Sequence, residues 1–204
     1  MDTLQPPQSG SEASKAIDND STTIYHSKWG QNGVRCIFNG TYISKYGVQS
    51  YQVYPTTSSV SNNLKTGTYD AFENSTGIVF AQGEKVALFA QNIPTATTIN
   101  LIVKDFQTKI NGTVSYYPLQ NGVNVFQVTN PGMVYIAYFN SNSSLNDVKL
   151  NIVSGKINGY FDRETSSNNE WPELVSKTTY PYIDIRGKYT HLVYEKKALR
   201  NGSP

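Results

Sequence analysis

Cysteine and histidine are both scarce in this sequence of 204 residues. Cys36 is the only cysteine, so the chain can form no internal disulfide and no zinc site built from cysteines. The two histidines, His26 and His191, lie in separate segments, and neither has a glutamate next to it. A hydrolytic zinc site usually takes two histidines one helical turn apart, as in His-Glu-x-x-His. The sequence therefore predicts no metal site and no cofactor in this chain.

Charge is also low, at 16% of residues, and the formal net charge is only +2. A nucleic-acid surface would need a clustered basic face. The dense cationic run lies near the C-terminus, at Lys196, Lys197 and Arg200, and we interpret it as solvated. No stretch approaches the roughly 18 apolar residues of a membrane helix. We expect neither nucleic acid nor a membrane span among the partners of this chain.

The N-terminal residues 1–10 are rich in Pro, Gln and Ser, and we expect them to be a disordered leader. They lack the cationic start and the apolar run of a signal peptide. Residues 11–62 have a less regular pattern than residues 66–156 and end in the polar stretch TTSSVSNN, which is typical of a loop or linker.

Short alternating runs of apolar residues, bounded by turn residues, recur from residue 66 to 156 and predict an all-β fold, either a β-sandwich or a jelly roll. Turn pairs such as Asn121-Gly122 supply the residues that tolerate positive φ in hairpins. The strands expected from these runs are Ile78 to Phe80, Lys85 to Ala90, Thr98 to Val103, Thr113 to Tyr117, Asn124 to Val128, Met133 to Tyr138 and Val148 to Val153.

Beyond Gly155 the pattern predicts one short C-terminal helix in SSNNEWPELVSKT, with Pro172 in its first turn and a Ser or Asn cap. One or two closing strands are expected in residues 180–199. Trp171, at the helix start, is expected to be a packing anchor.

No catalytic constellation stands out from the residues, since there is no G-x-S-x-G elbow and no P-loop or dinucleotide glycine pattern. Two carboxylate pairs lie in segments that resemble loops, namely Asp18 with Asp20 and Asp162 with Glu164. Turn formation or capping, cation binding and catalysis are all open to these pairs. We retain Asp18 and Asp20 as weak cation candidates.

Aromatic residues are the more informative group, because a flat ring packs against the C–H face of a neutral sugar. Tyr25, His26 and Trp29 lie within five residues of one another, and Tyr54 lies further along in an apolar run. These four are the candidates for binding a glycan. The alternative for each is packing in the core, which we favour for Trp29 and for Tyr51.

Two stretches resemble known families. Residues 13–30, ASKAIDNDSTTIYHSKWG, and residues 50–57, SYQVYPTT, resemble discoidin (coagulation-factor type C) sugar-binding modules. Such a module is longer than residues 11–62, so the resemblance implies a partial or truncated discoidin-like segment there.

Residues 64–199 resemble the N-terminal β-domain of enhancin-like, mucin-degrading zinc metallopeptidases of gut bacteria. The resemblance rests on Tyr117, Leu119, Gly122 and Asn124 in one turn, on Gly132 and Tyr135 in the next strand, and on GYFD at residues 159–162 with Trp171. Family members carry a His-Glu-x-x-His helix further along the chain. The resemblance implies zinc only in a downstream catalytic domain, against which Tyr160, Phe161 and Trp171 would pack.

These observations lead to one functional hypothesis with an alternative. We expect residues 63–204 to be a β-sandwich accessory domain, not itself an enzyme, that binds mucin-type glycans or orients substrate for a secreted or cell-surface metallopeptidase. The alternative is a purely structural β-module that packs against the downstream protease domain.

Overall fold

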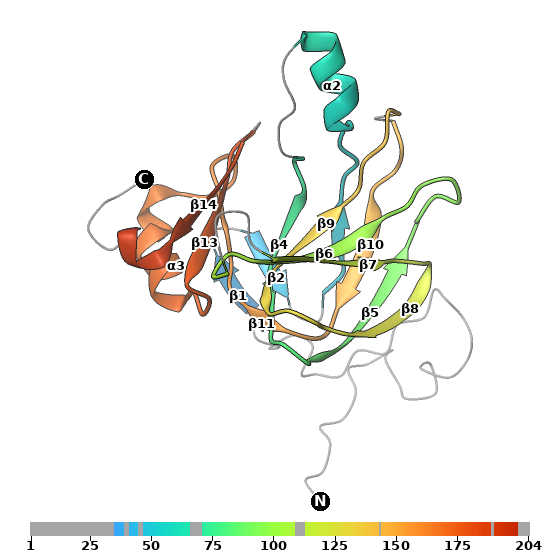
Figure 1. The fold of residues 1–204 in the computed structure, drawn as a ribbon. Coiled ribbons are helices and arrows are strands. Elements are labelled where there is room, and N and C mark those ends of the chain that lie inside the picture. The colour runs from blue at the N-terminus through green and yellow to red at the C-terminus, as the bar shows by residue number, and fades with distance from the viewer. Residues whose placement is uncertain are drawn as a thin grey trace, which may run out of the picture. The chain divides into compact units, whose positions relative to one another are not determined.

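Two antiparallel β-sheets face each other across the main hydrophobic core (Figure 1). The computed structural model describes residues 35–38, 41–44, 47–65, 71–108, 113–142, 144–188 and 190–199. The four-stranded sheet has the order β3 (Gln49–Tyr51), β10 (Val148–Ile152), β5 (Lys85–Gln91), β8 (Gly122–Gln127). The five-stranded sheet has the order β11 (Lys156–Ile157), β4 (Asn74–Phe80), β9 (Gly132–Ala137), β6 (Asn100–Asp105), β7 (Thr113–Pro118).

All seven strands expected between residues 66 and 156 are present, so the all-β prediction is confirmed. In β5 every second side chain is buried, and the buried set, Val86, Leu88 and Ala90, faces the core between the two sheets. This alternation is what a strand with one solvated face requires.

The central strands of the five-stranded sheet are buried on both faces, which the two-layer prediction did not include. β9 is buried at every position, and its run GMVYIA is continuously apolar apart from the Tyr135 hydroxyl. Val134 and Ile136 face the main core, whereas Met133 and Tyr135 belong to a second core on the opposite side. A strand covered on both faces reads as an unbroken apolar run because neither set of side chains meets water.

A three-stranded sheet of β12 (Phe161–Asp162), β13 (Tyr182–Arg186) and β14 (His191–Glu195) covers this second face. Its far side carries helix α3 (Trp171–Lys177), so the layers run from the four-stranded sheet to the five-stranded sheet, the three-stranded sheet and the helix. β13 and β14 are the closing strands that the sequence predicted. The 3₁₀ helix η3 (Lys196–Leu199) comes after β14 and contains the two lysines of the cationic run.

The predicted C-terminal helix is confirmed, with its start built as expected. The 3₁₀ helix η2 (Asn168–Glu170) precedes α3, and Ser167 and Glu170 form a capping box around it. Pro172 lies in the first turn of α3, where its missing N–H costs nothing.

A second helix, α2 (Thr57–Leu64), occupies the segment that we predicted to be a loop or linker. The Thr56 side chain accepts a hydrogen bond from the Ser59 amide, and Lys65 ends the helix in the left-handed conformation. No residue of α2 is buried, so no apolar stripe marked it in the sequence.

Part of the predicted discoidin-like segment belongs to the same β-structure. β3 pairs with β10, and Tyr51 is buried in the main core, as we favoured from the sequence. A separate pair, β1 (Arg35–Phe38) and β2 (Thr41–Ser44), precedes β3. Among the described residues, no helix is both long and apolar enough to cross a membrane.

Candidate functional site

Arg186, at the end of β13, joins two tyrosines that the sequence placed in different roles. Its Nη2 donates a hydrogen bond of 2.6 Å to the Tyr54 hydroxyl, and its positive charge acts on the Tyr160 hydroxyl. Its Nη1 lies 3.8 Å from Asp162 Oδ2. The glycan candidate Tyr54 and the packing candidate Tyr160 therefore share one guanidinium.

Phe72 completes this group with edge-on ring contacts. Its ring centroid lies 4.8 Å from that of Tyr54 and 4.4 Å from that of His191. The Arg186 guanidinium lies 5.8 Å from the Phe72 centroid, within the range of a cation–π contact. We call Tyr54, Phe72, Tyr160, Asp162 and Arg186 the Arg186 cluster.

Two separate sets of backbone hydrogen bonds bring the cluster together. The Tyr54 amide donates to the Tyr138 carbonyl at 2.9 Å, and the Asn140 amide donates to the Tyr54 carbonyl at 3.0 Å. This fixes Tyr54 at the end of β9. On the other side, the Arg163 amide donates to the Arg186 carbonyl at 2.9 Å and ties the end of β13 to the segment after β12.

The Arg186 cluster is only partly accessible to solvent. The Arg186 side chain is 21% exposed, and the Tyr54 and Tyr160 side chains are partly buried. Burial raises the pKa of Tyr160 above its ordinary value, and the positive charge of Arg186 acts in the opposite direction. Two phenol rings and a partly exposed guanidinium can contact the C–H faces and the hydroxyl or carboxylate groups of a sugar.

Behind this cluster, Asp184 forms a buried polar group with Ser75 and His191. The Ser75 hydroxyl donates to Asp184 Oδ2 at 2.5 Å, and His191 Nδ1 lies 3.5 Å from Asp184 Oδ1. Asp184 is 1% exposed. Burial raises the pKa of Asp184 to about 7 despite the opposing hydrogen bond from Ser75, and it lowers the pKa of His191 to about 4.

The three residue types of a serine hydrolase are present here, but their arrangement is not that of a triad. A triad needs histidine between serine and aspartate so that it can take the serine proton. Here Ser75 donates directly to Asp184. The adjoining crevice, lined by Thr76, Tyr135, Asp184 and Tyr160 among others, is too narrow to admit a water molecule.

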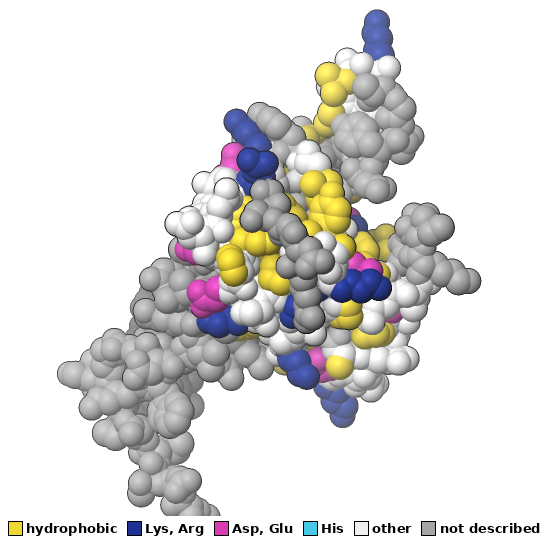
Figure 2. Space-filling view, turned by 90° about the vertical axis from the view of Figure 1, so that its left-hand side faces the viewer, with side chains coloured by type: hydrophobic (Ala, Val, Ile, Leu, Met, Phe, Trp, Pro, Cys, Tyr) yellow, Lys and Arg dark blue, Asp and Glu magenta, His cyan; other side chains and the backbone are white. Residues whose placement is uncertain are grey.

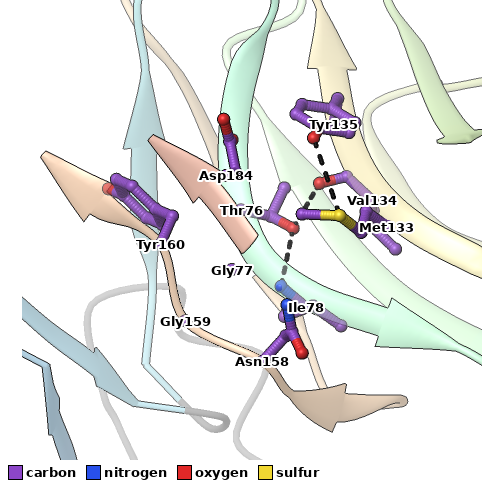
Figure 3. A pocket seen from close by; sticks show the side chains of 10 residues that line it. All are labelled: Thr76, Gly77, Ile78, Met133, Val134, Tyr135, Asn158, Gly159, Tyr160 and Asp184. Carbon is purple, nitrogen blue, oxygen red and sulfur yellow. Dashed lines mark hydrogen bonds between the residues drawn. The ribbon is translucent and has the colours of Figure 1, made fainter. Parts of the chain in front are cut away.

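Figure 3 shows this crevice, with Tyr160 on one side, Tyr135 and Met133 on the other, and Thr76 between them. The Thr76 hydroxyl donates to the Val134 carbonyl at 2.7 Å and accepts from the Ile78 amide at 3.1 Å. These two bonds supply hydrogen-bond partners to backbone groups in the irregular part of β4. There the pairing with β9 shifts register between Ser75 and Val79. The crevice is thus a packed seam of the fold and not a reaction chamber.

The described residues do not fit a catalytic metal. They contain no group of three or more His, Cys, Asp or Glu side chains that could hold an ion. Asp184 with His191 is a pair of potential ligands whose Oδ1 and Nε2 atoms have no hydrogen-bond partner among the described residues. Two cations, Arg186 and Lys104, already act on both groups, while Glu73 acts on Asp184 with the opposite sign. A metal ion would add further positive charge to this seam.

The other predicted site residues fall in two places. Phe161 and Trp171 are both buried and meet edge to face at 5.3 Å in the small core between the three-stranded sheet and α3. Their contacts are therefore made inside this fold, whereas Tyr160 retains an accessible surface. The remaining candidates lie outside the described residues: Tyr25, His26, Trp29, Asp18 and Asp20.

Sequence reasoning missed Arg186, Asp184 and Ser75 as members of a site. Ser75 and Asp184 are 109 residues apart, and Tyr54 and Arg186 are 132 apart, so no local motif links them. One signal was available, since Asp184 and Arg186 alternate with Ile183 and Ile185 in β13 and must share a face of the sheet.

The fold defined by these layers is similar to a part of several solved structures. The solved structures that match it include several that are described as metallopeptidases or their catalytic domains, and at the level of fold this supports the enhancin-like resemblance. Neither a scan of protein-family models nor a search of curated proteins found a match.

Three of the matched structures illustrate the relationship. A metallopeptidase in complex with Tn antigen is 24% identical, with a TM-score of 0.66, over 76% of this chain and 30% of its own. A metallopeptidase from Bacteroides thetaiotaomicron is 23% identical, with a TM-score of 0.66, over 85% of this chain and 28% of its own. The M60 catalytic domain of Clostridium perfringens ZmpC, in complex with the sialyl T antigen, is 16% identical, with a TM-score of 0.62, over 74% and 34%. This chain thus spans about a third of each structure.

The expectation that this chain is not itself an enzyme is wrong at the level of fold. The matched region lies inside structures described as a catalytic domain or a catalytic module, and it covers most of this chain. The fold of this chain therefore matches a part of these domains and not a module outside them.

The expectation that zinc belongs only to a separate domain is wrong for the same reason. The matched structures are metallopeptidase domains, so the metal belongs to the kind of domain of which this fold is a part. The sequence argument was wrong because it took the absence of a His-Glu-x-x-His pattern as a sign that the zinc site belongs to a different domain.

Proposed function

We propose that this chain forms the β-sheet region of a secreted or cell-surface metallopeptidase domain that cleaves glycoproteins, and that the Arg186 cluster contacts the glycan-bearing substrate. The observation that carries the proposal is the match of 74% or more of this chain to structures described as catalytic domains. A region built into such a domain is placed to line its substrate path.

The chemistry of the Arg186 cluster suits a glycan. Tyr54 was a glycan candidate from the sequence, and the structure puts it beside Tyr160 and Arg186. Phenol rings pack on the C–H faces of sugars, and a guanidinium pairs with hydroxyl groups or with the carboxylate of an acidic sugar. Two of the matched structures are complexes with the glycan antigens Tn and sialyl T, which supports a substrate class of mucin type.

Peptide-bond hydrolysis would use metal ligands from parts of the domain outside the described residues. In this proposal the described part of the chain contributes scaffold and substrate contacts. The proton-holding pair Asp184 and His191 lies in a seam closed to water and takes no part in hydrolysis.

The test measures glycan binding by the full chain on an array that includes mucin-type O-glycans. We expect binding that weakens at least about tenfold, equivalent to about 1.4 kcal/mol, when Arg186→Lys removes the planar donor fork. Tyr116→Phe is the matched control, because Tyr116 is 64% exposed on β7 and lies outside the cluster. Absence of binding by the wild-type chain, or equal loss in the control, would reject the glycan contact.

The peptidase assignment has its own test. The protein, in its longest expressed form, is incubated with a heavily O-glycosylated mucin and with the same mucin after enzymatic deglycosylation. We expect cleavage of the glycosylated form and its loss on addition of a metal chelator. Cleavage that survives the chelator would contradict a metallopeptidase.

A second candidate function, packing against another part of the domain, is favoured by an exposed apolar area on the three-stranded sheet. Leu192 and Tyr194 of β14 are each 45% exposed. Beside them, a groove of about 490 Å³ is lined by Ile185, Leu192 and Arg163 with neighbouring residues. Figure 2 shows the side of the molecule that carries this sheet, with hydrophobic side chains gathered near its centre and charged ones around them. Hydrogen exchange that protects β14 only in longer forms of the protein would support packing here, and equal exchange would reject it.

A further inference from the structure

β8 is an unprotected edge strand of the four-stranded sheet. The sheet order ends at β8, whose one partner among the described strands is β5 (Figure 1). Its six residues, GVNVFQ, contain neither a charged residue nor proline. Natural proteins usually protect such edges with lysine, proline, bulges or very short strands, because free backbone groups recruit another strand.

The other edges of the three layered sheets carry these protections. β3 has three residues, and β11 and β12 have two each. β7 ends in Pro118, and β14 bears His191 and Glu195. Among the described edges of these sheets, β8 alone combines length with an absence of charge and proline.

The backbone groups on the outer side of β8 are free to bond. The Gly83 amide donates to the Val128 carbonyl and the Val128 amide donates to the Glu84 carbonyl, so Glu84 and Val128 form a hydrogen-bonded pair. Because such pairs alternate along an antiparallel ladder, Asn124 and Phe126 bond to β5, while Val123, Val125 and Gln127 present their N–H and C=O groups outward. Among the described residues, no backbone partner is found for these outward groups.

The side chains along this edge are apolar and exposed. Val123 is 65% exposed and Val125 is 70% exposed, and Phe89, opposite Val123 on β5, is 43% exposed. A sheet face that meets water normally carries polar residues at these positions. The edge therefore combines free hydrogen-bonding groups with an uncovered apolar surface.

We propose that β8 pairs antiparallel with β8 of a second copy of this chain, about a two-fold axis near Val125. A two-fold axis places identical residues opposite each other, so any charge near it would face the same charge. β8 has none, and its edge is thus electrostatically compatible with itself. With Val125 opposite Val125 of the second copy, both backbone groups of Val123, Val125 and Gln127 find partners, and the valine side chains pair across the strands.

The experiment measures the mass of the full chain in solution by sedimentation over a concentration series. We expect the wild type to shift from monomer to dimer as concentration rises, and Val125→Lys to remain a monomer because two lysines would meet at the axis. Val48→Lys is the matched control, since Val48 is 59% exposed and adjoins β3 at the opposite edge of the same sheet. It should dimerise like the wild type.

Val123→Lys provides a second variant on the same edge, and circular dichroism confirms that each variant is folded. Hydrogen exchange of the wild type should slow at the Val123, Val125 and Gln127 amides as concentration rises. A wild type that stays monomeric throughout overturns the proposal. So does a dimer that survives both β8 variants, or one that the Val48→Lys control also abolishes. These outcomes are independent of glycan binding and of peptidase activity.

Discussion

His191 Nδ1 lies 3.5 Å from Asp184 Oδ1, yet the two side chains do not form an ion pair in weakly acidic solution. Burial raises the pKa of Asp184 to about 7 and lowers the pKa of His191 to about 4. Between these values the folded protein holds a protonated Asp184 and a neutral His191. Arg186 on the same strand, Lys104 on β6 and Glu73 just before β4 also act on Asp184 without reversing this order.

The two groups affect the pH dependence of stability with opposite signs. Between the unfolded value of 3.8 and about 7, Asp184 binds a proton only in the folded state, so its contribution to stability falls as pH rises. Between about 4 and the unfolded value of 6.5, His191 binds a proton only in the unfolded state, so its contribution rises with pH. In the wild type the two slopes largely cancel.

Asp184→Asn should reveal the pH dependence of stability that His191 contributes. Relative to wild type, its free energy of unfolding should rise by up to about 1.4 kcal/mol per pH unit between pH 4 and 6.5. The measurement is urea unfolding at several pH values in that range, with the wild-type value subtracted at each. A variant curve parallel to the wild type would show that Asp184 is ionised in the folded protein.

His191→Gln should have the opposite effect. With the histidine slope removed, the free energy of unfolding relative to wild type should fall as pH rises from about 4 to 6.5, because Asp184 alone then remains protonated in the fold. The same titration series checks it. Identical pH profiles for His191→Gln and wild type would contradict the low pKa assigned to His191.

Asn158→Ala should loosen the three-stranded sheet from the five-stranded sheet. Asn158 is fully buried; its Nδ2 donates to the Tyr182 carbonyl, and its Oδ1 accepts from the Thr179 and Tyr180 amides at 3.1 and 2.7 Å. Leaving these buried groups unpaired should cost about 3 kcal/mol or more.

Urea unfolding gives the total loss for Asn158→Ala, and hydrogen exchange of β13 and β14 shows whether the sheet opens locally. Asn121→Ala is the control, since Asn121 makes two similar bonds to Ile93 at an exposed site. Equal losses in the two variants would argue against a special role for Asn158.

Gly132→Ala should be among the most destabilising single methyl additions. Gly132 has φ +154°, and a Cβ there would lie 2.2 Å from the Lys104 carbonyl oxygen on the neighbouring strand. The backbone of β6 cannot move away without disturbing the sheet. We therefore expect the free energy of unfolding to fall by about 3 kcal/mol or more.

Gly83→Ala is the comparison for Gly132→Ala, with φ +76° and its nearest atom 4.0 Å away at the end of the Gln127 side chain. It should cost about 1 kcal/mol, for the backbone conformation alone. Thermal unfolding of both variants separates the two costs. Gly83→Ala measures backbone strain alone, and Gly132→Ala measures backbone strain together with the steric clash. Losses of similar size would show that β6 moves to admit the methyl group.

Alternation of apolar residues and turn residues predicted most strands, because both signals depend on residues close in sequence. The alternation in β5 and the Asn121-Gly122 turn before β8 are readable without knowledge of the neighbours. α2 was missed because none of its residues is buried and its stability comes from a cap and polar residues. The expectation that the chain is not itself an enzyme failed for a different reason, since the extent of a catalytic domain is a property of packing and no local pattern records it.

The sequence by itself determined an all-β chain with a short helix near its C-terminus, but the predicted two-layer sandwich did not include the second buried face of β9. Only the tertiary structure decided what covers that face, and thereby which polar residues meet. Ser75 and Asp184, or Tyr54 and Arg186, come together because a hairpin packs on a distant sheet. Hydrophobic burial selects such layers without regard to sequence separation, so the clusters between them cannot be read from local patterns.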